Sequence, residues 1–260
     1  MSELIKILAV AVAAVIVWTG VELVRNINIE KIPARDRSLS LNVDGNRVLW
    51  ALENGQPYDA QVLRDIETWT SRRFDASDFR LQSLARILYR HRDGIAQNEY
   101  ELIKRVFLDF KYWMDQPGVD GMCFWSENHQ LMFAASEFLA GQYWPDEVFS
   151  NTGLTGGEHR DMARARILTW LEQRWLYGFT EWYSNTYYVE DIAPLANLID
   201  FAQDEEIVDK ARIILDLLLY DLATQSWRGN FISSSGRMYA KGKRYPEKNG
   251  MQAVIDHIWD

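Results

Sequence analysis

Apolar residues recur at helical spacing along most of this 260-residue chain. Neighbours three and four positions apart share one side of a helix, so this spacing indicates amphipathic helices, and strand-like alternation is rare. The segments with this pattern are 59–73, 78–92, 98–114, 129–142, 157–176, 190–202 and 205–224. The pattern therefore predicts an all-α protein.

Loops that contain a Trp followed closely by an Asn separate several of these helices. Trp125, Trp182 and Trp227 stand in three such loops, at intervals close to the length of a two-helix unit. One hairpin cannot bury its inner face, whereas stacked hairpins can. We expect paired antiparallel hairpins that form an α/α toroid, with alternate loops meeting at one end. An amphipathic segment that starts at Met251 and stops without a cap predicts that this toroid is incomplete.

The N-terminus has a different pattern. An uninterrupted apolar run, Ile7 to Trp18, follows Lys6, as in a signal peptide or a signal anchor. No small-x-small cleavage site follows the run, so we favour an uncleaved anchor that holds the protein at a membrane. Either form of the segment places the rest of the chain outside the cytoplasm, in a bacterial periplasm or at the cell surface.

Three regions follow from these patterns. Residues 1–25 are the signal peptide or anchor. Residues 26–57 contain turn-forming dipeptides and form a linker and lead-in. Residues 58–260 form the helical-hairpin domain.

Composition narrows the functional classes. The net charge of −9 argues against a nucleic-acid partner, whose binding surface is basic. Cys123 is the one cysteine, which excludes an intrachain disulfide and favours a buried thiol over a nucleophile. No metal-ligand spacing and no phosphate-binding loop occurs, so we expect no metal and no cofactor.

The first of the three loops carries Glu127, Asn128 and His129 where a helix begins. A helix N-terminus favours a bound carboxylate. Asn128 fits either a contact to a substrate carboxylate or an N-cap. His129 fits either a base or a hydrogen-bonded structural residue. Glu127 fits either a general acid or a charge that supports the helix dipole.

The other two loops are rich in aromatic and basic residues. Glu181 and Asn185 lie among five aromatic residues, an arrangement suited to stacking on a pyranose ring. The last loop is basic, which suits an anion, although a solvated flexible loop is the alternative. Arg237 and Tyr239 would project to the same side of an extended segment, where the Arg holds the Tyr near ionisation.

These residues together resemble a known family. The segments Trp125–His129 and Gly178–Trp182, with a late Gly-Arg-x-Tyr stretch, are similar to the α/α-toroid polysaccharide lyases of the chondroitin AC/alginate lyase type. They look still more like a group of bacterial exported or anchored proteins with that fold. The resemblance covers about residues 75–245. It implies that Asn128 and His129 contact a uronate carboxylate, that Tyr239 transfers the proton, and that Arg237 supports it.

We therefore expect a carbohydrate-active protein that acts on a uronate-containing polysaccharide by β-elimination. Two alternatives stay open. One is a glycoside hydrolase that uses Glu127 and Glu181 as paired carboxylates. The other is a non-catalytic, membrane-anchored module that binds glycan or protein. The expected substrate-binding residues are Trp125, Trp182, Asn185, Tyr187, Tyr188, Trp227, Arg228 and Asn230.

Overall fold

The computed structural model describes residues 40–248 and 250–259. Contacts divide the chain into two units, Met1–Ile32 and Pro33–Asp260, and all described residues belong to the second. The expected signal or anchor segment, 1–25, lies outside the described residues. Among those that are described, no helix combines the length and the apolar character needed to cross a membrane.

The described part of the chain is mostly helical, which confirms the all-α class. Its ten α-helices are α2 (Gly45–Glu53), α3 (Gln61–Ser71), α4 (Ser77–Arg90), α5 (Gln97–Asp109), α6 (Glu127–Tyr143), α7 (Gly156–Tyr177), α8 (Tyr188–Phe201), α9 (Glu205–Gln225), α10 (Ala240–Arg244) and α11 (Gln252–Trp259). Two short 3-10 helices are η1 (Arg92–Gly94) and η2 (Pro246–Lys248). One small antiparallel hairpin joins β1 (Ser226–Trp227) to β2 (Asn230–Phe231).

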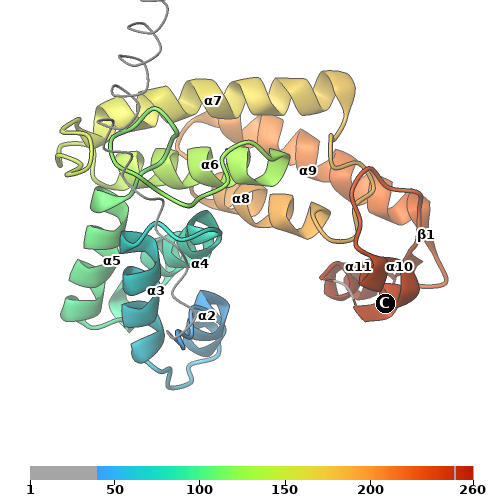
Figure 1. Ribbon diagram of the computed structural model, residues 1–260, viewed down its shortest axis with the longest axis horizontal. Helices are drawn as coiled ribbons and strands as arrows, with labels where there is room; N and C mark the ends of the chain where they lie inside the picture. Colours follow the sequence, from blue (N-terminus) through green and yellow to red (C-terminus); the bar gives the residue numbers. More distant parts are fainter. Residues whose placement is uncertain (1–39, 249, 260) are drawn as a thin grey trace, which may run out of the picture. The chain divides into compact units, whose positions relative to one another are not determined.

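Helices α6 to α9 form two antiparallel hairpins that lie side by side. Figure 1 shows α7 and α9 running along α6 and α8, whereas α3 and α5 stand at a steep angle to them. Helices α4, α6 and α8 pack on one another, and α7 and α9 pack on their other side. This arrangement brings the N-termini of α4, α6 and α8 within reach of one another.

The hairpin of α6 and α7 depends on two glycines. A Cβ on Gly141 would overlap the Gly156 carbonyl oxygen, and a Cβ on Gly156 would overlap the Trp144 carbonyl. The two backbones therefore approach more closely than any side chain would allow. Every residue of α6 from Leu131 to Gly141 is buried, so this helix lies at the centre of the core.

Two segments differ from the elements that the sequence predicts. Residues 45–53, inside the expected lead-in 26–57, form α2, because Val48 and Ala51 bury against α3 and α4. The basic loop after α9 is also more ordered than a flexible loop. It contains the β1–β2 hairpin and the short helix α10.

Candidate functional site

Glu127 is the first residue of α6, and its side chain is buried. Its carboxylate pairs with the Arg174 guanidinium at 2.6 Å and accepts hydrogen bonds from the Thr180 backbone N–H and hydroxyl, at 2.5 and 2.6 Å. Glu127 is 3% exposed, and Arg174 is also buried. These contacts tie α6 to α7 and to the loop before α8. The carboxylate is therefore occupied by structural partners and does not face a ligand.

Asn128 starts a chain of polar contacts that leads outward. Its side chain is fully buried and donates to one Glu181 carboxylate oxygen at 2.9 Å. The other oxygen of Glu181 accepts from Arg237 at 2.7 Å. Burial raises the pKa of Glu181, against the opposing effect of the Arg237 hydrogen bond. Because Asn128 is enclosed, it orients Glu181 and cannot itself touch a substrate.

Arg237 joins this buried chain to two tyrosines. Its guanidinium lies over the Tyr187 ring, 4.0 Å from the centroid, and donates a hydrogen bond to the Tyr239 hydroxyl. The Tyr187 and Tyr239 hydroxyl groups are 2.5 Å apart. The hydrogen bond from Tyr187 and the Arg237 cation lower the pKa of Tyr239, whereas burial raises the pKa of Tyr187 to about 12. Tyr239 is therefore the group of the pair that is closer to ionisation.

His129 lies beside this chain and has a partner that the sequence analysis missed. Its Nδ1 is 2.6 Å from a carboxylate oxygen of Asp78, which is fully buried in the first turn of α4. Burial lowers the pKa of His129, but the hydrogen bond and charge of Asp78 outweigh it, so the pKa is raised. Within the described residues, Nε2 of His129 makes no hydrogen bond, so this nitrogen is available to a ligand.

Two further carboxyl groups of α8 complete the cluster. Burial and the charge of Asp78 raise the pKa of Glu190 to about 7. Asp191 is fully buried, and neither of its carboxyl oxygens has a hydrogen-bond partner among the described residues. Burial raises the pKa of Asp191 well above its usual range and so favours its neutral form. Neither residue was expected from the sequence, because acidic residues in a first helical turn are common.

Backbone contacts hold Arg237 and Tyr239 in place. The Gly236 N–H donates to the Trp182 carbonyl at 2.9 Å, and the buried Ser184 hydroxyl donates to the Arg237 carbonyl at 2.6 Å. A Cβ on Gly236 would lie 2.6 Å from the Trp182 indole, so this position requires glycine. The loop before α8 therefore fixes the loop that carries the Arg and the Tyr.

The expected stacking residues fall into two groups. Trp125, Trp182 and Trp227 are 73%, 43% and 60% exposed, and their rings are accessible to a ligand. Tyr188 is fully buried, and its hydroxyl donates to Asp221 at 3.2 Å. Asn185 is also buried and donates to the Gly242 carbonyl at 3.2 Å. These last two residues are structural, because neither can reach a ligand.

The residues of the β1–β2 turn mainly contact one another. The Arg228 guanidinium covers the Trp227 ring at 4.3 Å from the centroid. The Asn230 amide donates to the Arg228 carbonyl at 3.1 Å. This turn follows the C-terminal end of α9. We therefore place Trp227, Arg228 and Asn230 outside the cluster around Arg237.

A second polar cluster has the outline of a catalytic triad. The Thr152 hydroxyl is 2.7 Å from Nε2 of His159, and Nδ1 of His159 is 2.6 Å from Glu137. However, His159 is fully buried, and burial lowers its pKa to about 4. The Leu154 N–H already donates to the same hydroxyl. The cluster fixes the loop between α6 and α7, and its His159 and Glu137 are enclosed while Thr152 is half-buried.

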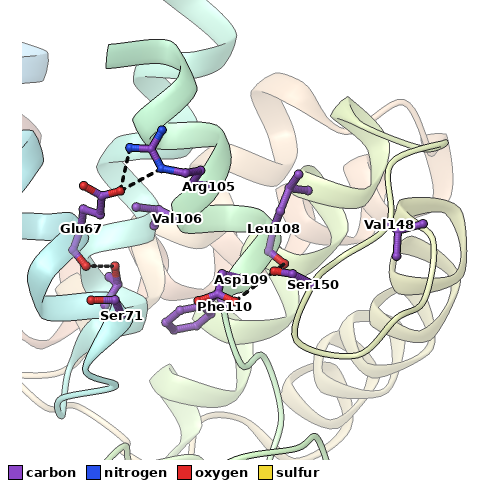
Figure 2. Close-up of a pocket in the computed structure, with 10 residues that line it drawn as sticks. Glu67, Ser71, Arg105, Val106, Leu108, Asp109, Phe110, Val148 and Ser150 are labelled. Carbon is purple, nitrogen blue, oxygen red and sulfur yellow. Dashed lines mark hydrogen bonds and ion pairs between the residues drawn. The ribbon is translucent and has the colours of Figure 1, made fainter. Parts of the chain in front are cut away.

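A hollow of about 420 Å³ lies between α3, α5 and the loop that follows α6 (Figure 2). Its walls include the apolar side chains of Val106, Phe110 and Val148, and the ion pair of Arg105 with Glu67 at 2.9 Å lies at its edge. None of the residues expected from the sequence lines it. We therefore treat it as separate from the Arg237 cluster.

Comparisons of this chain with models of protein families, with curated proteins and with solved structures gave no match.

Proposed function

We propose that this protein is a carbohydrate-active enzyme of the lyase type that cleaves a uronate-containing polysaccharide by β-elimination. The observation that carries the proposal is the placement of Arg237. This one cation touches the Glu181 carboxylate, the Tyr187 ring and the Tyr239 hydroxyl. A tyrosine whose pKa is lowered by a hydrogen bond and a fixed cation ionises more readily and is suited to act as a base.

The reaction needs a base and a positive site for the substrate carboxylate. Ionised Tyr239 takes the proton from the carbon next to that carboxylate. A carbon–carbon double bond then forms as the glycosidic carbon–oxygen bond breaks, and Tyr239 returns the proton to the leaving oxygen. His129 and Arg237 supply positive charge for the carboxylate, which makes removal of the proton easier. Asn128 acts only indirectly, through Glu181.

The paired-carboxylate hydrolase receives less support. Such an enzyme needs two carboxyl groups that flank a bound sugar. Glu127 is buried and committed to Arg174 and Thr180. Glu181 is 5% exposed, with Asn128 and Arg237 on its two oxygens. Neither carboxylate is free to act on a glycosidic bond.

The hairpins fit the proposed class. We propose that α4 to α9 belong to an α/α toroid-like scaffold, whose loop ends would form the substrate cleft. The first turn of α6 meets the loop before α8, at the contact of Asn128 with Glu181. The exposed rings of Trp125 and Trp182 would stack on sugar units beside the reacting one. The expected N-terminal anchor would hold the enzyme at the membrane, facing an extracytoplasmic polysaccharide.

The test is product formation by the full chain, kept in a mild detergent. Alginate, hyaluronan, chondroitin and pectate are incubated separately, and the ultraviolet absorbance of the unsaturated product is followed. We expect one polymer to give product, and we expect Tyr239→Phe to abolish it. Tyr220→Phe is the matched control, because Tyr220 is exposed on α9 and should be without effect. If wild type releases no product from any uronate polymer, or if Tyr239→Phe retains full activity, the proposal is wrong.

A further inference from the structure

The basic residues after Tyr239 differ from the other cations of the molecule. Between Arg228 and Lys248 there are six basic residues and one acidic residue, in a chain whose net charge is −9. Lys241, Lys243 and Arg244 lie on α10, and all three are exposed. The part of the chain described here thus contains a local positive surface that opposes the overall charge.

The lysines show the contrast most clearly. Before α10, the described lysines are Lys104, Lys111 and Lys210, and each pairs with a carboxylate at 2.5 to 2.7 Å. Lys241 and Lys243 make no ion pair with any described residue. Within residues 40–248 and 250–259, no carboxylate therefore neutralises these two charges. An anionic ligand could pair with them and release their counterions.

Helix α10 is held in a fixed position beside the proposed site. It begins directly after Tyr239, and the Lys243 N–H donates to the Tyr239 carbonyl at 3.1 Å. The buried Asn185 amide donates to the Gly242 carbonyl, and a Cβ on Gly242 would lie 3.0 Å from the Asn185 side chain. The backbone that carries the positive side chains is therefore held beside the segment of Arg237 and Tyr239.

We propose that α10 is a docking surface for a polyanionic polysaccharide, whose chain extends from Tyr239 along Lys241, Lys243 and Arg244. This inference rests on the proposed function, and it adds the direction of the chain and the nature of its charge. A polymer with an anion on each repeat can meet several cations at once, whereas a neutral glycan gains nothing from them.

Nucleic acid is the competing polyanion, and the observations favour the polysaccharide. The acidic remainder of the chain would repel a nucleic acid that extended beyond α10. A polysaccharide needs only a short segment on α10, because its reacting unit lies at Tyr239. Tyr245 at the end of α10 and Trp182, which lies against Gly236, are both partly exposed and provide rings for sugar stacking.

The test compares two triple variants of the full chain. Lys241→Gln/Lys243→Gln/Arg244→Gln removes the charges of α10. Arg72→Gln/Arg90→Gln/Arg212→Gln removes the same number of charges from exposed positions on other parts of the surface, so the net charge is equal. Dissociation constants are measured for hyaluronan, chondroitin sulfate, neutral dextran and single-stranded DNA. Circular dichroism checks that both variants are folded.

We expect the α10 variant to lose at least about tenfold in affinity for the anionic polysaccharides, and the control to change less than about twofold. The difference should vanish at about 1 M salt, where screening is strong. Binding of hyaluronan and chondroitin sulfate alike would identify the carboxylate as the recognised anion. Binding of chondroitin sulfate alone would identify the sulfate. Equal losses in both variants, equal binding of dextran, or tighter binding of DNA would overturn the inference.

The inference and the proposed function fail in different ways. If the α10 variant loses binding but wild type yields no unsaturated product, the docking surface stands and the lyase activity does not. If wild type yields product and the α10 variant keeps wild-type affinity and KM, the activity stands and the docking surface does not.

Discussion

The ion pair of Glu127 with Arg174 allows a direct test of whether Glu127 is structural or catalytic. Both groups are buried, and Glu127 also accepts two hydrogen bonds from Thr180. Glu127→Gln keeps the size of the side chain but leaves the Arg174 charge uncompensated. Removing one partner of a buried ion pair costs about 3–5 kcal/mol. For a domain of this size, that corresponds to a fall in Tm of about 6–20 °C.

The assay is thermal unfolding of the full chain followed by circular dichroism. Glu172→Gln on α7 is the control, because Glu172 is exposed and should change the stability by less than about 0.5 kcal/mol. The double variant Glu127→Gln/Arg174→Met should regain part of the loss, since no buried charge is then left alone. If Glu127→Gln unfolds at the wild-type temperature, the structural role is refuted. Loss of product formation at unchanged stability would instead support an acid in a hydrolase.

Three other perturbations test separate parts of the structure. The pKa of Glu190 rises from 4.5 to about 7 on folding. Glu190 therefore stabilises the fold below pH 4.5, and this stabilisation is lost as the pH rises to 7. The loss is at most about 3 kcal/mol. In urea titrations at pH 4.5 and pH 7, Glu190→Gln should remove this pH-dependent loss of stability. A pH dependence equal to that of wild type would contradict the role of Glu190. Gly141→Ala should destabilise the protein by about 1–3 kcal/mol in the same titrations, because the Cβ of the new alanine overlaps Gly156. Alanine otherwise favours helices, so a gain in stability would contradict this close approach. Arg237→Met should raise the pKa of Tyr239, seen in the ultraviolet difference spectrum of tyrosinate, and an unchanged titration would show that the cation is not the cause.

Most helices could be predicted because their signal is local. The period of the apolar residues in 98–114 or 205–224 depends on near neighbours alone. Helix α5 begins one residue before the first range, and α9 ends one residue after the second. Helix α2 was missed because turn-forming residues stand at both its ends, Asp44-Gly45 and Asn54-Gly55. Its few apolar residues become informative only when α3 and α4 cover them.

The candidate site, too, could be predicted from the sequence only in part. The proximity of Arg237 to Tyr239 could be predicted, since the two residues are separated by one position. The partners of His129 and Glu127 could not, because Asp78 and Arg174 come from other helices and reach the site only through tertiary packing. The sequence also did not show which of the candidate side chains are buried. Asn128 and Tyr188 have side chains suited to a sugar, yet the fold encloses both.

The central claim is that bond cleavage at Tyr239 proceeds by elimination, without addition of water. The most direct measurement is mass spectrometry of the products after digestion of a uronate polysaccharide by the full chain in heavy-oxygen water. We predict fragments that carry an unsaturated end group and no heavy oxygen. Incorporation of one heavy oxygen per cleavage would show hydrolysis, and a polymer that stays intact would show binding alone; either result would contradict the account.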